Sequence, residues 1–322
     1  MRPARQSLSA VALCVLSGTA AAQTTEAITL QTPSGLLAGT LTLSTGDLAR
    51  PLAIIIAGSG PTDRNGNTAG MPGGPDAYRL LADSLAAHGI ASLRYDKRGI
   101  AGSRAIGIRE SDLRFEMFAD DAAGWVSQAR TDRRFSTIVM VGHSEGSLLG
   151  MLAAQRSRPD AFVSLAGPAR RADFVLHEQL AAQLPPALQL RSDSILASLV
   201  RGDTVANTPP ELVALYRPSV QPYLISWFRY AGSVEIQKLT MPVLIVQGTH
   251  DVQVAPAEAE LLAAASPRAR VASIAGMNHV LKLTPPTLAE QMRFYVDPTV
   301  PLAPELVSAL VAFIVGVPTP RR

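Results

Sequence analysis

Residues 138–146 read Ile138-Val139-Met140-Val141-Gly142-His143-Ser144-Glu145-Gly146, and this stretch decides the fold. The four apolar residues predict a short buried strand, and the Ala/Leu-rich stretch Ser147–Arg156 predicts a helix. The two glycines indicate a turn so tight that a side chain at either position would clash. A serine in such a turn presents its hydroxyl at the end of a sheet, in front of the N-terminus of the next helix. That helix end stabilises negative charge on a nearby oxygen.

The pattern G-x-S-x-G is a weak signal when it stands alone, because a serine in that place can serve only as a helix N-cap. The strand before it and the helix after it favour a nucleophile elbow instead. We therefore interpret Ser144 as a nucleophile.

The N-terminus predicts a secretory signal peptide over residues 1–22, cleaved after about Ala22. Arg2 and Arg5 precede a short apolar stretch that ends in Ala20-Ala21-Ala22, and this stretch is too short to span a bilayer. The only cysteine, Cys14, lies within it, so we expect no disulfide and no thiol chemistry in the mature chain. The expected location is periplasmic or secreted.

Composition limits the fold class, the partners and the cofactors that we expect. The chain has 322 residues, of which 47% are hydrophobic, and this suits a large α/β core. Without Arg2 and Arg5, 27 basic residues stand against 26 acidic ones, and no basic run interleaved with aromatics argues for a nucleic acid partner. No histidine pair has metal-ligand spacing, so we expect neither a metal nor a cofactor. We expect a small-molecule substrate and no integral membrane segment in the mature chain; the oligomeric state stays open.

Apolar runs alternate with helical stretches, which predicts a mainly parallel central sheet flanked by helices. The expected strands are two within 27–43, then Leu52–Ala57, Ile90–Tyr95, Phe135–Val141, Ala161–Leu165, Val243–Gln247 and Arg270–Ile274, and the expected helices include Asp76–His88 and Ser111–Arg130. Residues 169–238 show no convincing buried strand and are interrupted by prolines. We interpret them as a helical cap insertion between two core segments, 23–168 and 239–322; an ordinary pair of outer helices with long loops is the alternative.

A serine hydroxyl needs a base. Five histidines are available: His88, His143, His177, His250 and His279. His279 follows the last predicted strand, where a parallel sheet presents catalytic side chains, and is the best candidate. Asp251 also follows a strand, and the chain order Ser144, Asp251, His279 is the Ser…Asp…His order of a hydrolytic triad. We predict that Asp251 orients His279.

Negative charge on a reacting oxygen needs two backbone N–H donors. Glu145, directly after the nucleophile, should supply one, and Ser59 in the Gly-rich loop after Leu52–Ala57 should supply the other, with Gly60 as second choice. No Gly-Lys-Ser/Thr follows this loop, so it does not indicate a phosphate site. We expect Gly60, Trp227 and Phe228 to line the substrate pocket. The alternative for the two aromatic residues is the core of the cap insertion.

Two charged pairs have structural interpretations. Asp96 and Arg98 indicate an ion pair or hydrogen-bond network at a strand end rather than a catalytic role. Asp63 and Arg64 lie beside the loop that should hold the oxyanion. We favour a role in shaping this loop over a contact between Arg64 and an acidic substrate.

These motifs together resemble the α/β-hydrolase superfamily over essentially the whole mature sequence. More narrowly, they are similar to its bacterial esterase and S33-peptidase-like branch. The stretches that carry the resemblance are 58–67 (GSGPTDRNGN), 95–99 (YDKRG), the elbow, 248–254 (GTHDVQV) and Asn278-His279. The resemblance implies an α/β-hydrolase fold, the triad, and carboxylesterase activity on short acyl esters. Ala57 departs from the pattern, since many relatives have His there.

The leading hypothesis is an exported serine carboxylesterase that cleaves short-to-medium acyl esters through an acyl-enzyme. A serine peptidase or amidase with the same triad is the main alternative, and a non-catalytic binding protein of this fold is a further one. A peptidase would need an acidic patch in the cap insertion to hold an amino terminus. Candidates for such a patch are Glu178, Asp193, Asp203, Glu211 and Glu235.

Overall fold

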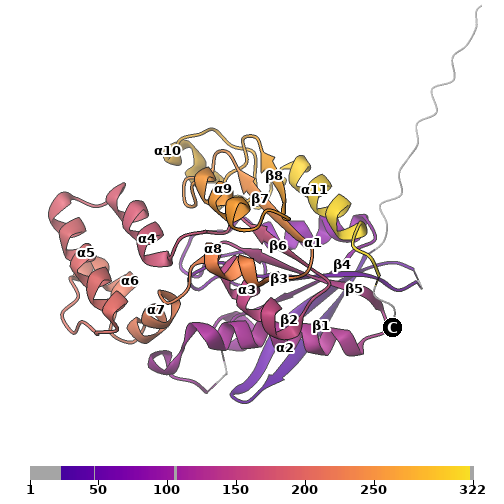
Figure 1. Ribbon diagram of the computed structural model, residues 1–322, viewed down its shortest axis with the longest axis horizontal. Coiled ribbons are helices and arrows are strands. Elements are labelled where there is room, and N and C mark those ends of the chain that lie inside the picture. The colour runs from indigo at the N-terminus through magenta and orange to yellow at the C-terminus, as the bar shows by residue number, and fades with distance from the viewer. Residues whose placement is uncertain (1–22, 47, 105–106, 320–322) are drawn as a thin grey trace, which may run out of the picture.

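The computed structural model describes residues 23–46, 48–104 and 107–319, so the predicted signal peptide over residues 1–22, with Cys14, lies outside the described residues. An eight-stranded sheet runs through the molecule in the order β1-β2-β4-β3-β5-β6-β7-β8 (Figure 1). The strands are β1 (Gln23–Thr32), β2 (Gly35–Ser44), β3 (Arg50–Ile56), β4 (Ala91–Tyr95), β5 (Phe135–His143), β6 (Ala161–Leu165), β7 (Val243–Gly248) and β8 (Arg270–Ile274). The β1–β2 and β2–β4 pairs are antiparallel, and all pairs from β4 to β8 are parallel.

Helices connect these strands. The α-helices are α1 (Ala77–Ala87), α2 (Phe115–Thr131), α3 (Glu145–Ser157), α4 (Ala172–Ala181), α5 (Pro186–Arg201), α6 (Val213–Tyr216), α7 (Gln221–Trp227), α8 (Gly232–Glu235), α9 (Pro256–Ala265), α10 (Leu288–Gln291) and α11 (Pro304–Val315). The helix expected over Ser111–Arg130 begins only at Phe115, because residues Glu110–Asp112 form a separate 3-10 turn.

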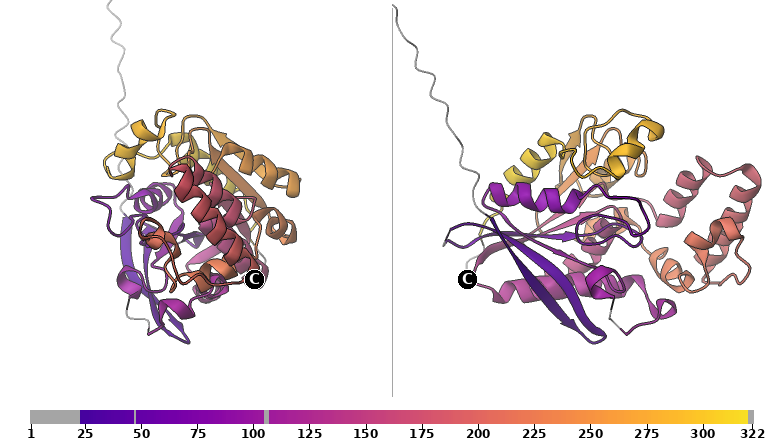
Figure 2. Two further views of the ribbon diagram at one scale, coloured as in Figure 1. Left: turned by 90° about the vertical axis from the view of Figure 1, so that its left-hand side faces the viewer. Right: turned by 180° about the vertical axis from the view of Figure 1, so that it is seen from behind.

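Both faces of the sheet are buried because successive side chains of a strand point to opposite sides. In β3, Leu52, Ile54 and Ile56 belong to one hydrophobic core, whereas Ala53 and Ile55 belong to the other. Residues of α2, α3 and α9 complete the first core, and residues of α1 and α11 complete the second. The sheet thus lies between two helical layers (Figure 2). This is the parallel, doubly covered sheet that the apolar runs predict.

The cap insertion (169–238), all of which the structure describes, contains helices and no strand. Its helices α4–α7 project from one end of the sheet (Figure 1), and α8 returns to pack against α3 and α9. The two ends meet: Arg171 and Ala231 form a single antiparallel bridge, and Ser233 N–H donates to Ala169 C=O at 2.8 Å. The segment therefore leaves the core and rejoins it at one place.

We expect Gly146→Ala to destabilise the fold. A Cβ at Gly146 would lie 2.3 Å from the Ile56 carbonyl oxygen and 2.6 Å from that of Ala57. Neither backbone group can move freely, so the clash should cost about 1–3 kcal/mol or more, in excess of the ~1 kcal/mol that alanine gains in a helix. Thermal unfolding followed by circular dichroism measures the effect. Gly107→Ala is the control, because a Cβ there meets nothing within 4 Å; equal melting temperatures for both variants would contradict the expectation.

Candidate active site

Ser144 lies in the turn between β5 and α3, and its backbone is strained. Its φ is 55° and its ψ is −124°, a conformation that residues other than glycine rarely adopt. The turn is as tight as the sequence predicts, since a Cβ at Gly142 would lie 2.2 Å from the Gly146 carbonyl oxygen. The serine therefore stands directly at the N-terminus of α3.

Asp251 and His279 come together from the loops after β7 and β8. His279 Nδ1 lies 2.8 Å from Asp251 Oδ2, and both side chains are buried. The other carboxylate oxygen accepts the backbone N–H groups of Gln253 and Val254, each at 2.9 Å. Burial alone would raise the pKa of Asp251, but the facing His279 and these hydrogen bonds hold that pKa below its usual value. The carboxylate is thus charged and can orient an imidazole.

A cavity of about 310 Å³ joins these elements. Ser144 and His279 line it together with Gly58, Ser59 and Gly60. Gln253 and Tyr295 form part of another wall and are hydrogen-bonded to each other at 3.0 Å. Within the described part of the chain, Ser144 Oγ and His279 make no direct hydrogen bond. Such contacts often tighten only when a substrate binds.

Hydrogen bonds to the N–H group and to the carbonyl oxygen of Gly58 hold the loop after β3 in place. Its N–H donates to Tyr78 Oη at 3.0 Å, and its carbonyl oxygen accepts Lys97 Nζ at 2.5 Å. The Ser59 carbonyl oxygen accepts Thr62 Oγ1 at 2.9 Å. Among the described residues, the N–H groups of Ser59 and Glu145 donate to no protein acceptor. The two predicted donors are therefore available to a ligand.

His143 connects the site in a way that sequence reasoning missed. Its Nδ1 lies 2.8 Å from Tyr78 Oη, and its Nε2 lies 2.9 Å from the His279 carbonyl oxygen. Because a carbonyl oxygen only accepts, Nε2 carries the proton and Nδ1 accepts the tyrosine hydroxyl. Burial, with a smaller contribution from His279, lowers the pKa of His143 to about 3. A neutral chain thus runs from Gly58 through Tyr78 and His143 to the loop of His279.

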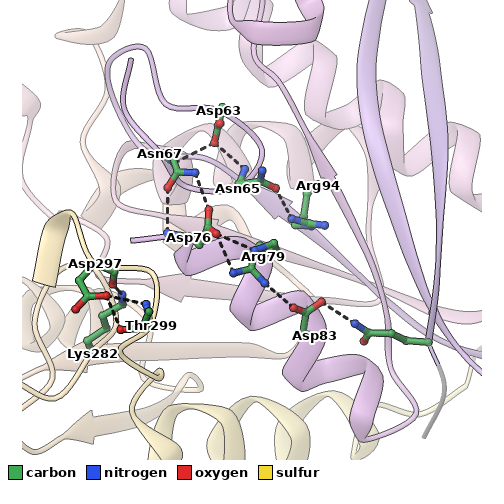
Figure 3. Close-up of polar contacts among 11 residues, drawn as sticks. Asp63, Asn65, Asn67, Asp76, Arg79, Asp83, Arg94, Lys282, Asp297 and Thr299 are labelled. Carbon is green, nitrogen blue, oxygen red and sulfur yellow. Dashed lines mark hydrogen bonds and ion pairs between the residues drawn. The ribbon is translucent and has the colours of Figure 1, made fainter. Parts of the chain in front are cut away.

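The rest of the Gly-rich loop is anchored by its own side chains (Figure 3). Asp63 Oδ1 accepts the backbone N–H groups of Asn65 and Asn67 at 2.8 and 3.0 Å. Asn65 Oδ1 accepts Arg94 at 2.6 Å, and Asn67 Nδ2 donates to Asp76 at the start of α1 at 2.6 Å. The turn-rich sequence thus folds onto β4 and α1, as expected for side chains that shape a loop.

Arg64 has the structural position that we favoured. It makes a two-pronged ion pair with buried Asp96, through Nε at 3.0 Å and Nη2 at 2.6 Å. Arg98 instead pairs with Asp121 on α2, at 2.6 and 2.5 Å. Asp96 and Arg98 therefore both belong to structural ion pairs, but with partners from other segments and not with each other.

Of the residues expected to line the pocket, only Gly60 does so. Trp227 stacks on Phe115 of α2, with ring centroids 5.7 Å apart and planes 8° from parallel. Phe228 is also buried, in the same hydrophobic core. Trp227 thus joins the cap insertion to α2, and neither aromatic residue lines the cavity beside Ser144.

No acidic side chain of the cap insertion lines the cavity of Ser144. Four of the five candidates pair with nearby basic residues, as Glu178–Arg170, Asp193–His177, Asp203–Arg201 and Glu235–Lys238. Glu211 lines a separate, larger cavity of about 1060 Å³ within the insertion itself.

Two further features of the described residues bear on cofactors and membranes. They hold no group of three His, Cys, Asp or Glu side chains arranged to bind a metal ion. None of their helices has the length and apolar character needed to cross a membrane.

The chain belongs to the family described as serine aminopeptidase, S33, which matches residues 70–283. Over 233 residues it is 29% identical to "Esterase EstD" of Thermotoga maritima, covering 70% of this chain and 52% of that protein. It thus spans about half the length of this relative.

Solved structures with a similar fold include "Est1E from Butyrivibrio proteoclasticus", with a TM-score of 0.57 and 19% identity over 90% of this chain and 97% of that one. Proline iminopeptidase of Mycobacterium smegmatis is also similar, with a TM-score of 0.54 and 17% identity over 90% and 98% of the two chains. At these identities the likeness shows the fold alone. Together with the family, it confirms the predicted α/β-hydrolase fold.

The buried neutral state of His143 predicts acid sensitivity. In the unfolded chain a histidine has a pKa of about 6.5, whereas folding lowers that of His143 to about 3. Its contribution to stability is therefore complete above pH ~6.5 and is lost as the pH falls towards ~3, by up to ~1.4 kcal/mol per pH unit. Urea unfolding at several pH values measures this loss.

His143→Gln should flatten that pH dependence, because glutamine does not titrate. His88→Gln, at an exposed position, is the matched control and should keep the wild-type slope. An unchanged slope in His143→Gln would contradict a neutral buried imidazole.

Proposed function

We propose that the protein is a serine carboxylesterase that cleaves short-to-medium acyl esters. Ser144 attacks the ester carbonyl while His279 Nε2 takes its proton, and Asp251 stabilises the resulting imidazolium. The N–H groups of Ser59 and Glu145 stabilise the oxyanion. His279 then returns the proton to the leaving alcohol, and water hydrolyses the acyl-enzyme. The observation that carries the proposal is the 2.8 Å contact between Asp251 and His279, beside the cavity that His279 shares with Ser144.

The cavity favours an uncharged ester over a peptide. Its polar walls are neutral groups, among them Thr62, Gln253 and Tyr295. A peptidase that recognises a free amino terminus needs a carboxylate there, since an unpaired ammonium in a closed site is costly. The acidic candidates in the cap insertion are paired with nearby basic residues or, in the case of Glu211, line a separate cavity. At about 310 Å³ the cavity is also at the small end of ligand sites, which supports short acyl groups.

The aminopeptidase alternative remains open because the family bears that description. Hydrolysis of nitrophenyl esters of increasing chain length, compared with that of aminoacyl anilides, separates the two. Faster turnover of the anilides would overturn the proposed ester preference.

We also propose that residues 1–22 are a signal peptide and that the mature enzyme is exported. N-terminal sequencing of the protein recovered from a periplasmic extract tests this: a first residue at or near Gln23 supports export. An intact Met1 there contradicts cleavage.

Ser144→Ala should reduce kcat for a nitrophenyl ester by about 10⁴-fold or more, because the nucleophile is lost. A fluorophosphonate probe should label the wild type and leave the variant unlabelled. Circular dichroism controls for folding. A well-folded variant that keeps more than about a tenth of the activity would exclude Ser144 as nucleophile and would revive the idea of a binding protein.

Asp251→Asn should lower kcat by roughly 10³–10⁴-fold near neutral pH. Asparagine preserves the shape of the side chain, but its amide favours the wrong imidazole tautomer. Asp203→Asn, at an exposed ion pair in the cap insertion, is the control and should be fully active. A loss below tenfold in Asp251→Asn would mean that another group orients His279.

A further inference from the structure

Lys97 lies buried behind the loop that supplies Ser59, although the reaction itself makes no use of a lysine. Its side chain is 5% exposed. Its Nζ donates to the Gly58 carbonyl oxygen at 2.5 Å and to Glu145 Oε1 at 3.3 Å. The sheet order explains this reach. Strand β3 lies between β4 and β5, so the loop after β4 that carries Lys97 ends beside both the Gly58 loop and the elbow.

The contact with Gly58 bears directly on Ser59. The Gly58 carbonyl and the Ser59 N–H belong to one peptide unit, and the structure contains no cis peptide among the described residues. In a trans peptide these two groups point in opposite directions. An ammonium bonded to the oxygen therefore fixes where the N–H points. Its charge also draws electrons from the amide, so the N–H becomes a stronger donor.

Gly58 cannot turn away from this arrangement easily. Its own N–H is held by Tyr78 Oη at 3.0 Å. A Cβ added to it would lie 3.2 Å from Ser144 Cβ, so its Cα faces the nucleophile closely. The two peptide units on either side of Gly58 are thus each fixed by one side chain, and the Ser59 N–H is left for the ligand.

The second contact of Lys97 reaches the residue that carries the other donor. The Glu145 side chain is 2% exposed and extends from the first residue of α3 to Lys97. One ammonium therefore links the residues that carry the two N–H groups of the oxyanion hole.

We propose that Lys97 is a positioning residue for the oxyanion hole, which holds and polarises the Gly58–Ser59 peptide and ties it to Glu145. The inference rests on the proposed hydrolase function. Lys97 acts through the backbone and does not touch the substrate. Its contribution is therefore made in the transition state, where charge develops on the oxygen, and not in substrate binding.

If Lys97 and Glu145 form only a structural ion pair, the expected effect of replacing them is different. Removing only Lys97 leaves Glu145 buried without a cation, beside the buried hydroxyl of Tyr223, and this destabilises a fold whatever else the lysine does. Replacing both residues with apolar ones of similar volume removes the unpaired charge, although it also removes the carboxylate beside the Tyr223 hydroxyl. If the Lys97–Glu145 pair is only structural, the double variant should recover both stability and activity. If Lys97 positions the Gly58–Ser59 peptide, the double variant should recover stability but not activity.

The test compares Lys97→Met with the double variant Lys97→Met/Glu145→Met. The control is Lys238→Met, which breaks a Lys–Glu pair of 2.8 Å outside the site. Measured quantities are kcat and KM for nitrophenyl butyrate, urea stability, and the Ki of a trifluoromethyl ketone. Ser144 Oγ adds to the ketone carbon as His279 takes the hydroxyl proton, the new Oγ–C bond replaces the carbonyl π bond, and the resulting hemiketal oxyanion occupies the hole.

We expect both Lys97 variants to lose about 10–100-fold in kcat, somewhat less than the loss of a whole oxyanion donor. KM should change less than threefold, and the Ki of the ketone should rise by about the same factor as kcat falls. The double variant should unfold at a higher urea concentration than Lys97→Met, and Lys238→Met should keep full activity. If Lys97→Met does not fold, the kcat of the double variant and the Ki of the ketone for it test the proposal on their own.

Recovery of kcat and Ki in the double variant to within about threefold of the wild type would overturn the role of Lys97 and leave the proposed function intact. A wild type that neither hydrolyses esters or anilides nor binds the ketone would overturn the proposed function and this inference with it.

Discussion

The close approach of α3 to the carboxyl end of β3 is the constraint on which the whole site depends. Gly146 lies against the carbonyl groups of Ile56 and Ala57, with no room for a side chain between them. This contact forces Ser144 into its positive φ and sets it beside Gly58. Because β4 is the other neighbour of β3, its loop reaches the same place. The loops after β3 and β4 and the start of α3 are far apart in sequence but thus lie together. Their buried polar groups must therefore hydrogen-bond to one another.

The groups around Ser144 meet this requirement almost entirely among themselves. Asp251 pairs with His279, which lines the cavity, His143 bridges Tyr78 to the loop of His279, and Lys97 bridges Gly58 to Glu145. A buried polar group without a partner costs about 1–3 kcal/mol, so each bond restricts the loops to one arrangement. Among the described residues, the N–H groups of Ser59 and Glu145 donate to no protein acceptor, and the buried side-chain atoms Asn278 Nδ2 and Gln247 Oε1 also have no partner. Two free backbone donors held on a framework whose other bonds are largely made are preorganised for an anionic transition state.

The sequence predicts the parts of this structure that depend on local pattern. Alternating and continuous apolar runs identify the strands, and the glycines around Ser144 identify the elbow, since both signals arise within a few residues. Local pattern does not predict which charged side chains pair with each other. Arg98 meets Asp121 of α2, and Arg64 meets Asp96, because the strand order brings these segments together, and a single sequence does not specify that order. Tyr78 and His143 were missed for the same reason. Neither residue type is unusual at its position, and their role exists only as a hydrogen-bonded chain that joins the Gly58 loop, α1, the end of β5 and the loop of His279.

The position of the aromatic residues in the cap insertion shows how chemical type alone misleads. Trp227 and Phe228 have the character of an acyl pocket, yet both are buried in the hydrophobic core, where Trp227 attaches the insertion to α2. The walls near Ser144 come instead from core loops, through Met71, Gln253 and Tyr295. The insertion still reaches the site indirectly, since Gln179 of α4 donates to the Gln253 carbonyl oxygen at 2.7 Å. For the proposed esterase, substrate choice therefore belongs to the loops that also carry the triad. Tyr223 of α7 also interacts with the Glu145 side chain at the elbow. Changes in the insertion therefore act through the Asp251 loop and the Glu145 side chain, since no residue of the insertion lines the cavity of Ser144.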